Sequence, residues 1–406
     1  MKDEKEPADK TINAAHDSSL IPHPSSFILP GRPTWAEINL DNLVHNFRLI
    51  KKTVGAGVAI MAALKADAYG HGAVSCALAL EGEGADWFGV ALPEEGLKLR
   101  DAGVTRPVLC LGGFWEGQED TVIARSLTPV LFRLDLLERF NSAARAAGVT
   151  ADYHLKIDTG MRRLGVLYEE LEEFLAGAAG FENVRLDGLM THFAAADDPE
   201  KAEFTRHQIT LFESAVQTVR NQGYNPTWIH EANSAAILAY EQAHGNLIRP
   251  GGLLYGVWRD ATIPTAAPLD WRPVLSLHSR IVLLKAVGSG VPIGYGGTFV
   301  TSRPSLIATL AIGYEDGMSR ALSNKGRVIV RGQFAPIVGR ISMDLTIIDV
   351  TDVADVRTGD EVVIIGTQAA SHISAEDIAG TLGTISYEVT CRISERVPKV
   401  IVGSRQ

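Results

Sequence analysis

Short apolar runs alternate with longer amphipathic segments over the first two thirds of the chain. Each run has the length and β-branched character of a buried strand, and each longer segment has apolar residues at helical spacing. The runs are VAIMAALK (58–65), DWFGVAL (86–92), PVLCLGG (107–113), LTPVLF (127–132), DYHLKIDTG (152–160), VRLDGLMTHF (184–193), TWIHEANS (227–234) and NLIRPGGLLYG (246–256). Eight such alternations predict an α/β fold, a (β/α)8 TIM barrel. A doubly wound open sheet is the alternative, but no GxGxxG motif follows the first run.

The segments on either side of the predicted barrel have different patterns. From about Trp271 onward, alternating or fully apolar strands are separated by Gly, Asp and Asn turns, which predicts a mostly β domain with one clear helix at ISAEDIAGTLG. The polar segment before Pro33 lacks the apolar stretch of a signal peptide, so it is interpreted as a disordered tail. We therefore predict a tail at 1–32, a barrel at 33–270 and a β domain at 271–406. The segment WAEINLDNLVHNFRLIKK predicts a strand and a helix capped by Asp41.

Composition narrows the function class. The chain has 406 residues and a net charge of −10, with no basic cluster, which argues against nucleic-acid binding. Its three cysteines lie far apart without a CxxC motif, which fits a reducing cytoplasm better than a disulfide framework. No apolar run has transmembrane length. We therefore expect a cytoplasmic protein that binds neither nucleic acid nor membrane.

Lys65 ends the first apolar run. An ammonium group at the end of a buried strand loses hydration, so its pKa tends to fall and its amine becomes a possible Schiff-base nucleophile. A lysine whose charged end simply reaches solvent is the alternative. In a TIM barrel the carboxyl ends of the strands form the active-site face. Several other polar residues follow the predicted strands at that same face: Tyr69, Lys156, Asp158, Arg163, His192, His230, Asn233, Ser234, Arg249, Gly251 and Gly252.

Two of these segments are compatible with a phosphate group. Asn233 and Ser234 precede a helical stretch, whose amino terminus would offer backbone N–H groups. Gly251 and Gly252 allow a ligand to approach the backbone closely. Taken alone, the first segment is more typical of a helix cap and the second of a turn. Together with Lys65 they suggest pyridoxal phosphate, which needs an amine, phosphate donors and a partner for its ring nitrogen.

Nine motifs then occur in order along nearly the whole chain: ALKADAYGHG, KIDTGMRRLG, MTHFAAAD, HEANSAA, RPGGLLYG, YGGTF, GYEDG, GRISMD and SYEVTCRISERVPK. With them the chain resembles the alanine racemase family of fold-type III pyridoxal phosphate enzymes. The resemblance implies a two-base isomerase that interconverts L- and D-alanine and supplies D-alanine for peptidoglycan. It also implies a head-to-tail homodimer with shared active sites, and no metal ion. A racemase of this family that acts on serine, lysine or a broad set of amino acids is the alternative.

The resemblance also implies residue roles. Lys65 would hold the cofactor and act as base on the D-enantiomer, while Tyr295 of the partner subunit would serve the L-enantiomer from the opposite face. Arg249 would bond the ring nitrogen and His192 would stack on the ring, with His230 orienting either of them. The phosphate group would be bound by a further set: Tyr69, Asn233, Ser234, Gly251, Gly252 and Tyr387.

The remaining implied roles concern the substrate. Arg163 would bind its carboxylate, Lys156 would be carbamylated beside Arg163, and the backbone of Met343 would reach the substrate from the partner subunit. The substrate corridor would have a polar lining: Tyr314, Arg320, Arg340 and Asp197. The chain departs from the family pattern at three positions, Arg162, Gly252 and Lys399, where a smaller residue, a bulky apolar residue and an arginine are respectively more usual. Arg162 is expected to face solvent.

Overall fold

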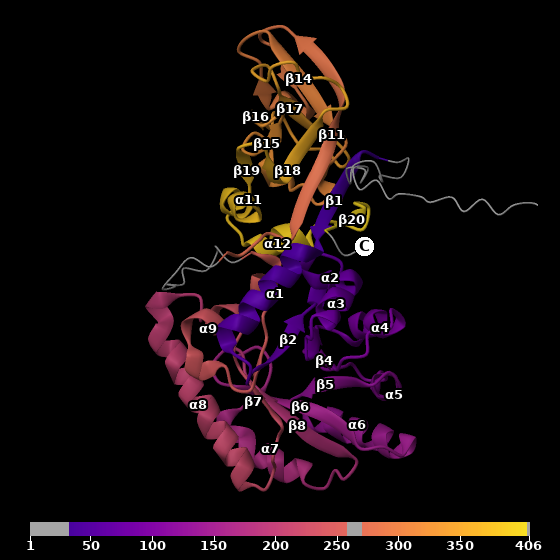
Figure 1. Ribbon diagram of the computed structural model, residues 1–406, viewed down its shortest axis with the longest axis vertical. Helices are drawn as coiled ribbons and strands as arrows, with labels where there is room; N and C mark the ends of the chain where they lie inside the picture. Colours follow the sequence, from indigo (N-terminus) through magenta and orange to yellow (C-terminus); the bar gives the residue numbers. More distant parts are fainter. Residues whose placement is uncertain (1–31, 258–269, 404–406) are drawn as a thin grey trace, which may run out of the picture.

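The computed structural model describes residues 32–257 and 270–403, so the predicted tail falls almost entirely outside the described residues. The chain forms two parts, a barrel and a β-rich domain stacked along the long axis of the molecule (Figure 1). Helix α12 and strand β20 of the second part lie at the junction, beside α1 and α2 of the first (Figure 1). Within these residues, every helix is too short or too polar to cross a membrane.

Each predicted apolar run contains one strand of the barrel, so the predicted fold is confirmed. The strands pair in parallel in the order β10-β2-β3-β4-β5-β6-β8-β9, and a parallel bridge between Asn233 and Arg249 joins the two ends. The strand bounds are β2 (Ala59–Ala63), β3 (Trp87–Val90), β4 (Val108–Cys110), β5 (Leu127–Leu131), β6 (Ala151–Asp158), β7 (Val166–Leu167), β8 (Val184–Met190), β9 (Trp228–His230) and β10 (Leu247–Ile248).

The longer helices cover the outside of this barrel because each buries an apolar face. In α1, for example, Leu43, Val44, Phe47 and Ile50 are buried. That helix is capped by Asn39, whose side chain accepts from the amide of Asn42, and not by Asp41 as predicted. The bounds are α1 (Leu40–Val54), α2 (Lys65–Tyr69), α3 (Ala73–Gly82), α4 (Pro93–Asp101), α5 (Glu119–Ala124), α6 (Leu134–Ala147), α7 (Leu171–Ala178), α8 (Ala202–Asn221), α9 (Ser234–Ala239) and α10 (Gly252–Tyr255).

The barrel interior contains a layer of apolar side chains that is completed by two histidines. One apolar residue comes from each of β2, β3, β4, β5, β8 and β10: Met61, Trp87, Leu109, Val130, Met190 and Leu247. The two remaining strands, β6 and β9, contribute the buried His154 and His230, which contact each other. The inside of the barrel is thus a packed core with a polar seam.

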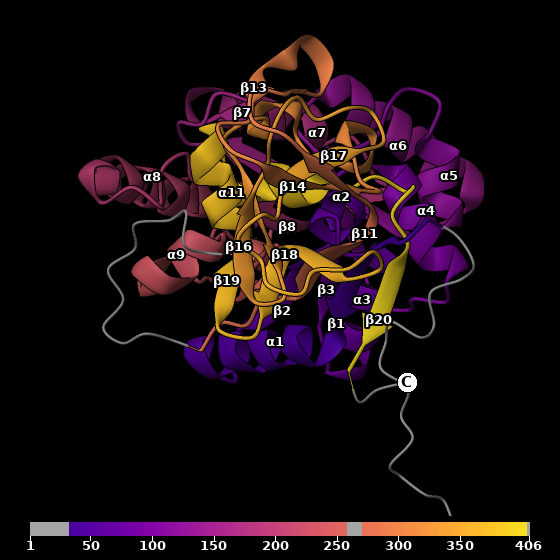
Figure 2. The same cartoon turned by 90° about the horizontal axis from the view of Figure 1, so that it is seen from above.

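The second part is mostly β, as predicted. Its main sheet has the order β16-β15-β18-β11-β1-β20, and in addition β14 pairs with β11, β17 with β14 and β19 with β18. The bounds are β11 (Leu275–Val287), β12 (Pro292–Ile293), β13 (Phe299–Val300), β14 (Ser305–Leu310), β15 (Arg327–Val330), β16 (Gln333–Pro336), β17 (Thr346–Asp349), β18 (Glu361–Gln368), β19 (Ser371–Ile373), β20 (Lys399–Val402), α11 (Ala375–Leu382) and α12 (Ser386–Cys391). Figure 2 looks down on these strands, with α4 to α6 of the barrel on one side and α8 on the other.

Strand β1 (Thr34–Asn39) precedes the barrel in sequence but joins the sheet of the second part. It pairs antiparallel with β11 and parallel with β20. From β1 onward the chain therefore runs from the β domain into the barrel and back, which ties the two parts together at their junction. The division at residues 270 and 271 stays a prediction.

Candidate active site

Lys65 directly follows β2 at the carboxyl end of the barrel strands. Its ammonium group lies 5.8 Å from the centre of the Tyr69 ring. Burial lowers the pKa of Lys65, and the positive charges of Arg163 and Arg249 lower it further. A larger fraction of this amine is therefore uncharged than in a free lysine, as a nucleophile or a base requires.

The turn after Lys65 is left-handed. Four consecutive non-glycine residues, 66–69, have φ between 53° and 56°, a conformation that costs roughly 1–2 kcal/mol per residue. Several contacts hold the turn. The amide of Ala66 donates to Glu95 (2.7 Å), and Asp67 accepts from the amide of Ala73 (2.8 Å). Asp67 also forms an ion pair with Lys399 of β20.

The β domain of the same chain presses on this turn. A side chain at Gly70 would place its Cβ 2.2 Å from the carbonyl oxygen of Thr390 in α12. Position 70 must therefore be glycine, also because its φ of 86° is left-handed. Lys399 keeps the positive charge of the arginine that is more usual at this position. Through its ion pair with Asp67, that charge helps to hold the turn.

The hydroxyl groups of Tyr69 and Tyr387 face the paired glycines after β10. A Cβ at Gly251 would lie 2.6 Å from the hydroxyl of Tyr69, and one at Gly252 would lie 2.3 Å from the hydroxyl of Tyr387. The hydroxyl of Ser234 accepts from the amide of Gly251 at 2.8 Å. This set combines backbone N–H groups with three hydroxyl groups, and neither glycine position has room for a side chain. These features fit a phosphate group. Asn233 caps α9 by accepting from the amide of Ala236, so it shapes the same turn.

Arg249 is buried, and its two terminal nitrogens are fully engaged. Nη1 donates to the ring Nδ1 (3.0 Å) and the carbonyl oxygen (2.7 Å) of His230. Nη2 donates to the carbonyl oxygens of Thr191 (2.7 Å) and Glu231 (3.0 Å) and reaches Nδ1 of His192 at 3.3 Å. Among the described residues no hydrogen bond engages its Nε, which leaves that N–H for an acceptor such as a pyridine nitrogen. Burial lowers the pKa of Arg249 to about 10, so the side chain stays charged at neutral pH.

This donor fixes the hydrogen positions of two buried histidines. An arginine only donates, so Nδ1 of His230 is an acceptor and its Nε2 carries the hydrogen. That hydrogen points at Nδ1 of His154, 2.8 Å away. Burial, first of all, lowers the pKa of both rings, that of His154 to about 3, so both are neutral. The two neutral histidines therefore hold the guanidinium group of Arg249 from the barrel interior and add no charge.

His192 is held by Gln208, a residue that the sequence analysis did not single out. Gln208 lies on α8 and is fully buried. Its amide nitrogen donates to Thr159 (3.1 Å) and to the carbonyl oxygen of His192 (3.4 Å), and its amide oxygen accepts from Ala194 (3.0 Å). The signal that could have identified it is a polar side chain on the buried face of an amphipathic helix.

Lys156 is buried within β6, and burial lowers its pKa to about 8, with the positive charges of Arg163 and Arg249 as further causes. Its neighbour Arg163 is exposed. Arg162 is exposed as well, as expected, and has a left-handed φ of 57°. The barrel mouth thus brings together Lys65, Lys156 and Arg249, with Arg163 close enough to affect both lysines.

Two predicted residues are not part of this group within one chain. Tyr295, in the turn η5 (Tyr295–Gly297), is 69% exposed, and Met343 is 50% exposed. Among the described residues no hydrogen bond or ring contact joins either to Lys65. The predicted corridor residues Tyr314, Arg320, Arg340 and Asp197 are exposed as well, and a wide surface pocket includes Tyr314 and Arg320.

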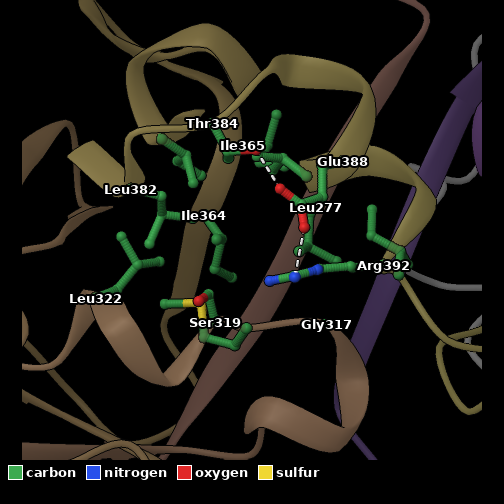
Figure 3. Close-up of a pocket in the computed structure, with 14 residues that line it drawn as sticks. Leu277, Gly317, Ser319, Leu322, Ile364, Ile365, Leu382, Thr384, Glu388 and Arg392 are labelled. Carbon is green, nitrogen blue, oxygen red and sulfur yellow. Dashed lines mark hydrogen bonds and ion pairs between the residues drawn. The ribbon is translucent and has the colours of Figure 1, made fainter. Parts of the chain in front are cut away.

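A second, narrow cavity lies inside the β domain and is unrelated to the barrel mouth. Its walls are mostly apolar, including Leu277, Ile364 and Leu382, and an ion pair between Glu388 and Arg392 lies at one side (Figure 3). No predicted site residue lines it. Its lining contains no lysine, cysteine or histidine, so the barrel mouth is the better candidate for chemistry.

Known proteins match this architecture over nearly its whole length. The family models of the N-terminal and C-terminal domains of alanine racemase match residues 38–258 and 274–401. The alanine racemase of Geobacter sp. (strain M21) is 44% identical over 381 residues, 92% of this chain and 100% of the relative. That of Sorangium cellulosum (strain So ce56) is 46% identical over 382 residues, 91% and 98% of the two chains.

Solved structures agree with these matches. The alanine racemase from Bacillus anthracis with bound L-Ala-P is 34% identical, with a TM-score of 0.87 and coverage of 93% of this chain and 96% of that one. The alanine racemase from Bartonella henselae with covalently bound pyridoxal phosphate is 30% identical, with a TM-score of 0.82 and coverage of 92% and 100%.

Proposed function

The chain belongs to the alanine racemase family, whose members are pyridoxal phosphate-dependent racemases, and on that premise we propose that it interconverts L- and D-alanine. Its role would be to supply D-alanine for peptidoglycan, and it would act in the cytoplasm. The observation that carries the proposal is the partly buried Lys65, whose pKa is lowered by burial and by Arg163 and Arg249, beside a cradle of paired glycines.

The residues at the barrel mouth fit the cofactor. Lys65 would hold it covalently, and its phosphate would be bound by one group of residues: Tyr69, Asn233, Ser234, Gly251, Gly252 and Tyr387. Nε of Arg249 would donate to the ring nitrogen, and His192 would lie against the ring face. The bound cofactor withdraws electrons from the substrate's Cα, which makes the Cα–H bond acidic.

Racemisation needs one base on each face of the substrate. The Lys65 amine would take the α-proton of D-alanine and return a proton to that face. The Tyr295 phenol of the partner subunit would do the same for L-alanine on the opposite face. Arg163 would bind the substrate carboxylate, which keeps the Cα–H bond aligned between the two bases.

Lys156 would be carbamylated. With a pKa of about 8, a useful fraction of its amine is neutral at physiological pH, so its nitrogen can attack the carbon of CO2 and release one proton. The product is an anion. An anion at this place would attract Arg163, whereas the unmodified ammonium group repels it.

The active unit would be a homodimer with shared sites. Tyr295 and Met343 are exposed in one chain, as are nearby Tyr314 and Leu345. A second copy that covers them would place Tyr295 and the backbone of Met343 at the partner's barrel mouth. A racemase that acts on serine, lysine or several amino acids is the alternative, since the same groups recognise any α-amino acid backbone.

The test is proton NMR of L-alanine with the cofactor-loaded protein in D2O, with chiral analysis of the same sample. We expect the α-proton signal to disappear while D-alanine forms. Exchange without inversion would mean that the Lys65 face works and the Tyr295 face does not. No exchange with alanine, but exchange with serine or lysine, would replace the proposed substrate.

A further inference from the structure

His71 lies in the loop that carries Lys65, and the mechanism above gives it no role. We propose that His71 is a positioning residue whose single ring N–H holds the left-handed turn at 66–69 and thereby sets the places of Lys65 and Tyr69. Its Nδ1 lies 2.9 Å from the carbonyl oxygen of Ala68 and 3.0 Å from that of Tyr69. These are the last two carbonyl groups of the turn.

The hydrogen-bond partners determine the state of the ring. Both oxygens only accept, so Nδ1 must carry the hydrogen. The ring is completely buried, and burial lowers its pKa to about 4, so it is neutral at physiological pH. Its Nε2 has no hydrogen-bond partner among the described residues. His71 also lines a cavity between the two parts of the chain, together with mostly apolar residues such as Pro273, Leu275 and Ile373.

The position of the ring is itself fixed from its other side. His71 stacks on Tyr255, with the ring centres 4.5 Å apart and the planes 29° apart. The hydroxyl of Tyr255 donates to the carbonyl oxygen of Ala63 at 2.7 Å, at the last residue of β2. The stacked pair therefore contacts the backbone both before and after Lys65.

Loss of the ring N–H of His71 would release only part of the turn at 66–69. The backbone amide of His71 also donates to Ala68 (3.1 Å), so part of the turn closure remains in any variant. The carbonyl group of Tyr69 depends more on the ring. If the turn relaxes towards ordinary backbone angles, the hydroxyl of Tyr69 moves away from Gly251 and the amine of Lys65 shifts with it.

A matched pair of variants isolates the N–H group. Asparagine can place an amide N–H where Nδ1 lies, whereas leucine has a similar shape and no donor. In the full-length, cofactor-free protein, hydrogen exchange in peptides that span residues 66–72 should be at least about tenfold faster in His71→Leu than in the wild type, and within about threefold of it in His71→Asn. Peptides from β6 serve as the internal control.

A second measurement is the dissociation constant for pyridoxal phosphate, and it rests on the proposed function. We expect binding at least about tenfold weaker in His71→Leu and nearly normal in His71→Asn. If the leucine variant does not fold, His71→Gln replaces it, because its amide lies closer to the Nε2 position.

The outcomes separate the two hypotheses. Equal exchange in the leucine variant and the wild type, or equal acceleration in the leucine and asparagine variants, would overturn the role of the N–H group. Wild-type protein that fails to bind pyridoxal phosphate would overturn the proposed function, while the exchange experiment on the cofactor-free protein would still decide the role of His71.

Discussion

The barrel mouth and the turn that carries Tyr295 differ in how firmly one chain holds them. At the mouth, Arg249 is buried with its terminal nitrogens bonded, and Lys65 is braced on both sides. Tyr295 is 69% exposed on a short turn with glycine on either side. The comparison indicates that one chain completes the cofactor half of the site, and that the second base depends on an additional surface.

The largest expected effect comes from removing Lys65 from the cofactor half of the site. Lys65→Ala removes both the covalent anchor and one base, so activity should fall by at least about 10⁴-fold. The visible absorbance of the cofactor-bound protein should also disappear. Lys98→Ala, at an exposed position of α4, is the control and should leave both unchanged. Retained absorbance at the same wavelength in Lys65→Ala would assign the anchor to another amine.

The second half is tested by Tyr295→Phe, which removes only the hydroxyl. Abstraction of the L-alanine α-proton should slow by about 10² to 10⁴-fold, and that of D-alanine much less, because only one face loses its base. The measurement is α-deuterium exchange from each enantiomer in D2O. Tyr168→Phe in the barrel is the control. Equal slowing of both enantiomers would argue against a base that serves one face.

Mixing these two inactive variants asks whether the halves come from different chains. In a heterodimer of Lys65→Ala and Tyr295→Phe subunits, one site combines both defects and the other is intact. Random reassociation gives heterodimers in about half of the molecules, so about a quarter of the wild-type activity should return. No recovery, although native mass spectrometry detects heterodimers, would place both bases in the same chain.

The same contrast explains what the sequence could and could not predict. The barrel was predictable because each strand appears in the sequence as a separate apolar run. Its mouth was predictable because the carboxyl ends of the parallel strands lie at one face. The left-handed turn at 66–69 was not, since Ala and Tyr disfavour that conformation and Asp adopts it only occasionally, as a single residue. The pairing of β1 with β11 and β20 joins residues far apart in sequence, which no local pattern reports. His154 carried a detectable signal, a polar residue at an inward position of an apolar strand.

A smaller effect tests the bonding behind His192. Gln208→Leu removes one donor pair and one acceptor while filling similar space, and leaves the backbone of His192 and Ala194 without these partners. We expect a loss of about 1–3 kcal/mol in the free energy of unfolding of the cofactor-free protein, measured in urea, and weaker binding of pyridoxal phosphate. Gln217→Leu, exposed on the same helix, is the control. Equal stability of the two variants would mean that the loop holds His192 without Gln208.

The last effect depends on pH and concerns a buried carboxyl group in the barrel half. Glu231 follows His230, and burial raises the pKa of its side chain to about 8. The folded state therefore keeps a proton that the unfolded chain releases near its ordinary pKa of 4.5, so stability should fall as pH rises from about 4.5 to 8. The upper bound on this loss is about 5 kcal/mol.

Glu231→Gln is neutral at every pH and should flatten that part of the profile, whereas Glu173→Gln, at an exposed position, should not. Urea unfolding at pH 5, 6, 7 and 8 measures the slope for each variant. An unchanged slope in Glu231→Gln would mean that the carboxyl group is already ionised in the folded barrel, stabilised by the nearby positive charge of Arg249. The barrel half would then contain a charge pair where burial alone predicts a neutral acid.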